Sequence, residues 1–198
     1  MLSIQDDLSA KGWSAQTDYF PPDLIAALGR ELDMRREEGV LTPAGIGRGD
    51  RHQVQPGIRN DHTLWLDGES AAQNEYLRLM DALRIKLNQS LFLGLHEFEA
   101  HYAHYPSGGF YKRHVDALKG QRNRVVSTVT YLTPGWRGAD EGYLVLYSHD
   151  EQELARILPT AGTLAVFMSE DIPHEVLPPR RERCSIAGWF RCRQSPGS

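Results

Sequence analysis

The chain has 198 residues, of which 40% are apolar and 24% charged, and these proportions predict one globular domain spanning residues 1–198. Its 22 Lys and Arg against 26 Asp and Glu give a formal charge of −4, which excludes the basic field of a generic nucleic-acid-binding protein. Apolar runs such as 24–28 are far shorter than the roughly 20 residues of a membrane span, and residues 1–7 lack a secretory leader pattern. We therefore expect a cytoplasmic protein with neither nucleic acid nor membrane as partner.

Two N-terminal segments have the apolar spacing of helices. Residues 21–32 begin with two prolines, where a helix start tolerates them, and continue with apolar positions on one side. Ser70 and Gln73 match a capping box, and apolar residues follow at helical spacing: Tyr76, Met80, Leu83 and Leu87. We expect both helices to pack on one face of a sheet, in a helical cover of about residues 20–95.

The stretch between these helices, residues 40–62, is rich in Gly, Pro and charged residues and has little apolar periodicity. This composition predicts a long loop or mobile hairpin. Long loops inside a compact domain are usually functional or disordered.

After residue 96 the chain consists of short segments rich in β-branched and aromatic residues, separated by Gly and Pro. The predicted strands are 97–105, 110–116, 124–133, 143–147, 154–158, 163–168, 174–178 and 183–193. So many short strands predict a mainly β fold with flanking helices, an antiparallel sandwich or barrel such as a jelly roll, with its core at about 96–193.

His114 and Asp116 form an H-x-D triplet in one predicted strand. The triplet is weak evidence alone, but residues i and i+2 of a strand share a face, so an imidazole and a carboxylate can reach one ion. His174 begins another predicted strand and is the candidate for a third ligand. Two His and one carboxylate with open positions are typical of non-haem Fe(II) oxygenases, whereas structural zinc closes four positions, usually with Cys.

Arg183 is the candidate anchor for an acidic cosubstrate. The alternate residues Ser185, Ala187 and Trp189 share its face of the last predicted strand. An inward guanidinium would fork onto one end of a dicarboxylate while the other end chelates the metal. Pairing of this arginine with a surface acid remains an alternative, with Arg180, Arg181, Arg191 and Arg193 as nearby competitors.

Four motifs together resemble the 2-oxoglutarate- and Fe(II)-dependent dioxygenases. They are His-Tyr-Pro-Ser-Gly-Gly-Phe-Tyr-Lys-Arg-His-Val-Asp at 104–116, Val-Thr-Tyr-Leu at 129–132, the segment 162–176 and the end 183–189. The chain is most similar to prolyl 4-hydroxylases of the oxygen-sensing, hypoxia-inducible-factor type and their bacterial relatives. The resemblance runs from about residue 20 to 193 and implies a double-stranded β-helix, a jelly-roll variant.

The resemblance implies a role for each matching residue. The iron ligands would be His114, Asp116 and His174. The residues at 2-oxoglutarate would be Arg183, Tyr131, Tyr105 and Trp189, and those at the substrate would be Arg124, Tyr111, Arg59, Asp61 and Trp65. Arg59, Asp61 and Trp65 lie in a segment similar to the one that ends the family's mobile finger loop, which folds over the bound peptide.

The activity implied is prolyl 4-hydroxylation with Fe(II), 2-oxoglutarate and O₂, with ascorbate as reductant. The implied partner is a protein bound through a prolyl-containing loop, for bacterial relatives elongation factor Tu, and we expect a monomer. One alternative is a related oxygenase acting on another protein side chain or a free amino acid. The other is a non-catalytic protein that senses 2-oxoglutarate or oxygen.

Three features depart from the family pattern. Glu141 replaces the first glycine of a Gly-Gly pair, Ala187 replaces a threonine near the iron-bound water, and a long C-terminal helix is missing. We expect substrate closure to depend more on residues 40–62. Two further histidines, His101 and His104, are not expected to form a metal pair, because a spacing of three on a strand puts them on opposite faces.

Overall fold

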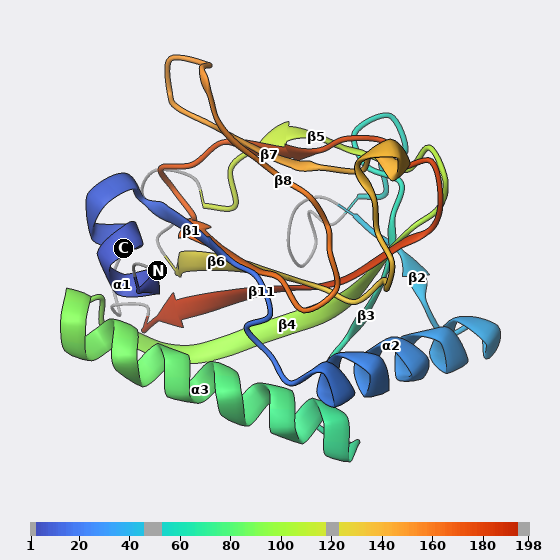
Figure 1. Cartoon of the computed structure of the whole chain (residues 1–198), viewed down its shortest axis with the longest axis horizontal. Coiled ribbons are helices and arrows are strands. Elements are labelled where there is room, and N and C mark those ends of the chain that lie inside the picture. The colour runs from blue at the N-terminus through green and yellow to red at the C-terminus, as the bar shows by residue number, and fades with distance from the viewer. Residues whose placement is uncertain (1–2, 46–52, 118–122, 194–198) are drawn as a thin grey trace.

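A computed structural model describes residues 3–45, 53–117 and 123–193, and its strands form two antiparallel sheets (Figure 1). The larger sheet has the order β1-β9-β6-β11-β4-β3-β2, with bounds β1 Trp13–Gln16, β9 Leu164–Met168, β6 Arg124–Tyr131, β11 Arg183–Cys192, β4 Leu95–Tyr105, β3 His62–Trp65 and β2 Thr42–Pro43. The smaller sheet has the order β5-β10-β7-β8, with bounds β5 Tyr111–His114, β10 His174–Val176, β7 Leu144–Tyr147 and β8 Glu153–Ile157. The helices are α1 Ile4–Lys11, α2 Pro22–Glu37 and α3 Ala71–Leu91, with a 3₁₀ turn at Gly138–Asp140.

From β4 to β11 the chain alternates between the sheets, except that β7 and β8 follow each other in the smaller one. β4, β6, β9 and β11 belong to the larger sheet, and β5, β7, β8 and β10 belong to the smaller one. The sheets face each other, because Phe167 and Ala103 of the larger sheet share a buried cluster with Leu144 and Val176 of the smaller one. The prediction of a mainly β, jelly-roll-like core is confirmed.

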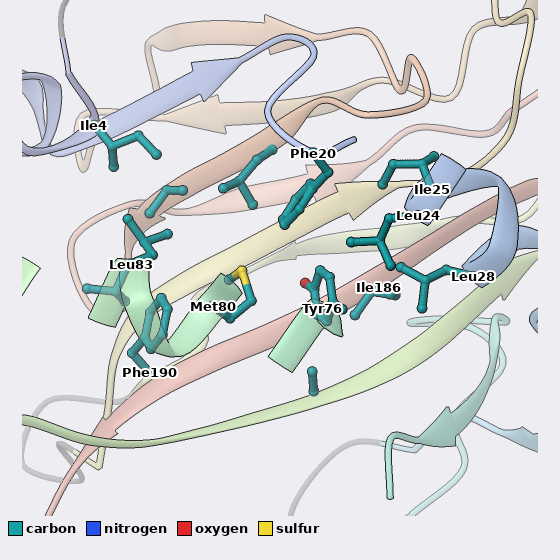
Figure 2. Packing of buried hydrophobic residues seen from close by; sticks show 14 of the residues in the cluster. Ile4, Phe20, Leu24, Ile25, Leu28, Tyr76, Met80, Leu83, Ile186 and Phe190 are labelled. Carbon is teal, nitrogen blue, oxygen red and sulfur yellow. The ribbon is translucent and has the colours of Figure 1, made fainter. Parts of the chain in front are cut away.

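Helices α2 and α3 cover the outer face of the larger sheet, as predicted (Figure 1). Figure 2 shows Leu28 of α2 and Tyr76 and Met80 of α3 close to Ile186 and Phe190 of β11. All five side chains are fully buried. Removal of this apolar surface from water stabilises the contact between the helical cover and the sheet.

The cap of α3 is only half of the predicted capping box. Ser70 Oγ accepts a hydrogen bond from the Gln73 amide at 3.0 Å. The Gln73 side chain does not return this bond; its Oε1 accepts from the amides of Asp67 and Gly68, and its Nε2 donates to Glu31 of α2. Gln73 is buried, so these three partners satisfy the amide group more completely than the box does.

The N-terminal helix α1 and strand β1 have no counterpart in the predicted elements. Ser3 and Asp6 form the capping box that starts α1, and β1 pairs with β9 as the edge strand of the larger sheet. Both elements are short and carry few apolar residues. Their position therefore depends on contacts with the rest of the fold, such as the pairing of β1 with β9, and not on a periodic apolar pattern in the sequence.

The described ends of the 40–62 stretch are ordered as strands; residues 46–52 lie outside the described part. β2 pairs with β3, which in turn pairs with β4. Just before β3, Ile58 O accepts from the Lys112 amide at 2.9 Å, and Arg59 forms a β-bridge with Tyr111 of β5. The segment 58–65 therefore joins one edge of the smaller sheet to β4 of the larger sheet.

Among the described residues, no helix combines the length and the apolar character needed to cross a membrane.

Candidate active site

Three predicted ligands come together between the sheets. The nitrogen and oxygen atoms that His114, Asp116 and His174 could offer to an ion all lie within 4.8 Å of one another. His114 Nε2 is 3.4 Å from Asp116 Oδ1, and His174 Nε2 is 3.6 Å from Asp116 Oδ2. Two imidazoles and a carboxylate at this spacing fit a divalent iron ion with open positions.

The prediction that His114 and Asp116 share a strand is wrong, because β5 ends at His114. The chain bends after this residue, and the amides of Asp116 and Ala117 donate to Ser169 O at 3.2 and 3.3 Å. His174 is opposite His114 in the β5–β10 pairing. The carboxylate therefore reaches the two imidazoles through a loop contact rather than through strand alternation.

Backbone carbonyls fix the tautomers of both histidines. His114 Nδ1 is 2.8 Å from Lys112 O, and His174 Nδ1 is 3.0 Å from Ile172 O. A carbonyl can only accept, so each Nδ1 carries the hydrogen and each Nε2 keeps its lone pair. Burial, with the neighbouring His114, lowers the pKa of His174 to about 4, which keeps this imidazole neutral and able to bind a metal.

Two donors orient the carboxylate. Ser127 Oγ and Trp189 Nε1 donate to Asp116 Oδ2 at 2.6 and 2.9 Å, and Ser127 also contacts Ser169 Oγ at 2.8 Å. Burial alone would raise the pKa of Asp116. His174, His114 and the Ser127 hydroxyl together lower this pKa by more than burial raises it, so the net shift is downward. The carboxylate is therefore ionised, as a ligand must be.

The triad lines a cavity of about 460 Å³ between the two sheets. Its wall includes the four alternate residues of β11 that the sequence predicts on one face, Arg183, Ser185, Ala187 and Trp189, and also Arg191. A larger cavity of about 780 Å³ lies against α2, and none of the triad residues lines it. The residues that line the smaller cavity therefore identify it, and not the larger one, as the candidate active site.

Arg183 is nearly fully buried, at 1% exposure. Its Nε donates to Gly142 O at 3.1 Å and its Nη1 to Ser185 Oγ at 3.3 Å, but its Nη2 has no hydrogen-bond partner. Tyr131 Oη is likewise buried without a partner, and the Arg183 guanidinium lies 4.9 Å from the centre of the Tyr131 ring. Burial raises the pKa of Tyr131 to about 12. Two unpartnered buried donors beside the same cavity fit the carboxylate of a dicarboxylic cosubstrate.

Glu141, where the resemblance leads one to expect a glycine, lies in the turn before β7. Glu141 has φ 56°, a left-handed conformation that favours glycine, and its side chain pairs with Arg180 at 2.6 Å. At Gly142, a Cβ would lie 2.8 Å from Pro179 Cβ. The glycine therefore allows the close approach that presents its carbonyl to Arg183.

Two of the predicted substrate residues, Arg59 and Tyr111, line the cavity beside His114, whereas Asp61 is buried behind Arg59 and does not line it. Asp61 and Arg59 form a buried pair at 2.6 and 2.7 Å, and the Arg59 guanidinium lies 4.2 Å from the centre of the Tyr111 ring. Tyr111 in turn stacks on His114 with ring centres 3.6 Å apart. The base of the 40–62 stretch is thus in contact, through one aromatic ring, with a predicted iron ligand.

The other predicted residues line the same cavity. Arg124 lies 3.5 Å from the centre of the Trp189 ring and pairs with Glu99 at 2.7 Å, whereas Trp65 is half exposed beside Trp189. Tyr105 packs against Arg183, with the guanidinium 5.1 Å from the ring centre.

Sequence reasoning missed Ser127 and His101, both of which have a polar atom toward this site. Ser127 lies four residues before Tyr131 on β6, and His101 lies four residues before Tyr105 on β4. An even spacing on a strand puts residues on one face, so strand alternation alone could have identified both.

Comparison with known proteins agrees with this geometry. Residues 100–191 match the family described as the 2OG-Fe(II) oxygenase superfamily. The chain is similar to a solved Pseudomonas putida prolyl-4-hydroxylase, with 46% identity, a TM-score of 0.88, and coverage of 95% of this chain and 97% of that one. It is also similar to a Trichoplax adhaerens prolyl hydroxylase solved with a hypoxia-inducible factor peptide, with 25% identity, a TM-score of 0.84, and coverage of 95% and 87%.

A curated relative is the hypoxia-inducible factor prolyl hydroxylase of Caenorhabditis elegans, 27% identical over 92% of this chain. The chain spans only 27% of the length of that relative. The similarity to the two solved structures confirms the double-stranded β-helix predicted from the motifs.

Proposed function

The chain belongs to the 2OG-Fe(II) oxygenase superfamily, and we propose that it is a prolyl 4-hydroxylase acting on a protein. The observation that carries the proposal is one cavity lined by a His-Asp-His cluster and by Arg183. Arg183 Nη2 and the Oη of the neighbouring Tyr131 are both buried donors without a partner. The cluster suits Fe(II), and the donors suit the far carboxylate of 2-oxoglutarate.

When bound, Fe(II) with 2-oxoglutarate and O₂ supplies oxidising power: one oxygen atom enters a substrate C–H bond, and 2-oxoglutarate becomes succinate and CO₂. The protein supplies position. His114, Asp116 and His174 would hold the metal, while Ser127 and Trp189 keep the carboxylate oriented through Oδ2. Apolar side chains in the wall, such as Leu144 and Phe167, exclude water from the reacting centre.

Arg183 and Tyr131 would hold the far end of 2-oxoglutarate. The guanidinium already donates to Gly142 O and Ser185 Oγ, so its plane is fixed before the cosubstrate arrives. Tyr105 closes the wall beside it. A preorganised donor pair of this kind gives affinity and also fixes the direction in which the cosubstrate lies.

The proposed substrate is a proline in an exposed loop of another protein. Arg59, Tyr111, Arg124 and Trp65 would line its path, with Asp61 holding the Arg59 guanidinium in place, and residues 40–62 would close over it. A relative solved with a hypoxia-inducible factor peptide supports a peptide substrate. For this chain we propose elongation factor Tu, and we propose that the enzyme acts as a cytoplasmic monomer with ascorbate as reductant.

Two alternatives remain as outcomes of the test. A related oxygenase would hydroxylate another protein side chain or a free amino acid, and a non-catalytic sensor would bind 2-oxoglutarate or oxygen without turnover.

The test combines the purified protein, Fe(II), ascorbate, 2-oxoglutarate and elongation factor Tu. We expect succinate to form in proportion to a +16 Da shift on one proline, identified as 4-hydroxyproline after hydrolysis. A shift on a proline of a different protein in a cell extract would reject elongation factor Tu alone. A shift on another residue would reject prolyl hydroxylation, and 2-oxoglutarate binding without turnover would reject the enzyme.

A further inference from the structure

His101 of β4 lines the active-site cavity but belongs neither to the metal cluster nor to the 2-oxoglutarate anchor. Its ring lies between two tryptophans, with ring centres 5.1 Å from Trp65 and 5.4 Å from Trp189. His104, by contrast, contacts Arg36 and Glu182 on the helical side of the sheet. The two histidines therefore occupy opposite faces, as their spacing predicts, and only His101 reaches the site.

The hydrogen-bonding state of His101 follows from its surroundings. The side chain is 5% exposed, and burial lowers its pKa to about 4, with Arg59 and Arg124 lowering it and Asp61 and the Tyr102 carbonyl raising it. The ring is therefore neutral at pH 7. Nδ1 is 3.0 Å from Tyr102 O, which can only accept, so Nδ1 carries the hydrogen and Nε2 carries the lone pair.

Nε2 is an acceptor that faces the cavity. Within the ranges that the structure describes, no side chain or amide donates to it, and it is not among the fully buried polar atoms that lack a partner. Its lone pair is therefore accessible from the cavity. It lies on the same face of β4 as Glu99, Ala103 and Tyr105, all of which line the cavity.

The expected ligands offer this acceptor few donors. Ionised 2-oxoglutarate and O₂ have no hydrogen to donate, and a prolyl residue has no backbone N–H. The nearest donors on a substrate peptide are the backbone N–H groups of the residues flanking the proline. Trp65, which is half exposed, and Trp189 provide flat apolar surfaces on either side of His101 for the peptide that carries them.

We propose that His101 Nε2 accepts a hydrogen bond from a backbone N–H next to the target proline, which makes His101 a substrate-binding residue. The bond fixes the register of the peptide in the cavity and selects against a second proline at the contacted position. This inference rests on the proposed prolyl hydroxylase function. The wild-type assay decides that function first, before any variant is compared.

The first test compares kinetic constants of wild type, His101→Phe and His101→Gln, using the peptide whose proline shows the +16 Da shift. Phenylalanine keeps the aromatic packing and removes the acceptor, so we expect KM for the peptide to rise about 3- to 10-fold, the value of one hydrogen bond. We expect kcat and the KM for 2-oxoglutarate to stay within about twofold. Glutamine returns an acceptor and should recover part of the loss.

A matched control is His96→Phe, on the same strand but exposed, which should change none of these constants. A merely structural role for His101 would instead alter kcat or the KM for 2-oxoglutarate together with the peptide KM. That outcome would overturn the proposal, and so would an unchanged peptide KM in His101→Phe.

The second test locates the donor. Two peptides are made in which one amide N–H beside the proline is replaced by an ester oxygen, on the N-terminal or the C-terminal side. In wild type, one of the two ester peptides should have a KM raised as much as His101→Phe raises the KM for the amide peptide. In His101→Phe, the same ester should not raise the peptide KM any further. Equal costs of each ester in wild type and variant would show that the N–H bonds elsewhere and would overturn the assignment.

Discussion

The two faces of β11 differ in chemistry although they belong to one strand. Ile186 and Phe190 face the helices and are fully buried among apolar side chains, whereas Arg183 and Trp189 face the cavity. The helical face lowers the free energy of the fold because apolar surface leaves water. The cavity face raises it, because a guanidinium is buried with Nη2 unpartnered. Stability and ligand binding are thus assigned to alternate residues of the same strand.

The largest expected effect is on the cavity face. Asp116→Asn keeps the shape of the side chain but removes the only carboxylate of the cluster, so we expect turnover and Fe(II) binding each to fall at least about 100-fold. Succinate release and metal titration measure the two losses. The exposed Asp171→Asn serves as the control, and substantial activity in Asp116→Asn contradicts the metal assignment.

On the helical face we expect stability to change instead of chemistry. Leu28→Ala opens a hole at a residue with 0% exposure, which should lower the free energy of unfolding by about 2–5 kcal/mol. Urea unfolding measures this loss, and kcat/KM well below the melting temperature should stay within about twofold. Leu154→Ala, at 40% exposure, should cost far less. A large loss of activity in folded Leu28→Ala protein would contradict the assignment of stability to the helical face and of activity to the cavity face.

A smaller effect is expected for the cosubstrate anchor. Arg183→Lys retains the charge but loses the planar fork, so the KM for 2-oxoglutarate should rise about 10- to 100-fold, the value of one or two charge-assisted bonds. The KM for the peptide should not change. Arg180→Lys, an exposed arginine paired with Glu141, is the matched control. An unchanged 2-oxoglutarate requirement would move the anchor to another residue.

At neutral pH the smallest effect is that of a buried histidine on the cavity face, because its cost to stability grows only as the pH falls. The pKa of His101 is lowered from 6.5 to about 4, so between these values the unfolded chain binds more protons than the folded one. Stability should therefore fall as the pH drops through this window, with this residue contributing up to about 1.4 kcal/mol per pH unit. Urea unfolding from pH 7 to 4 should show a shallower decline for His101→Phe than for His96→Phe. Equal slopes would contradict the pKa shift.

The sequence by itself determined much of the fold and the identity of the candidate ligands. Strand alternation gives Arg183, Ser185, Ala187 and Trp189 one shared face, and the structure finds all four in the cavity wall. Periodicity also identifies α2 and α3, because their apolar stripes must be buried. These patterns are local, so the sequence of one chain is enough to show them.

Only the tertiary structure decided how the ligands meet. Asp116 lies beyond β5, and the amides of residues 116 and 117 bring it to the histidines by bonding Ser169. The tertiary structure also decided the contacts of Gln73, which bonds to the turn at Asp67 and to α2 instead of completing the cap of its own helix. It likewise placed His101 between two tryptophan rings at the cavity. Each of these outcomes depends on contacts between residues distant in sequence, which packing sets and local propensity does not encode.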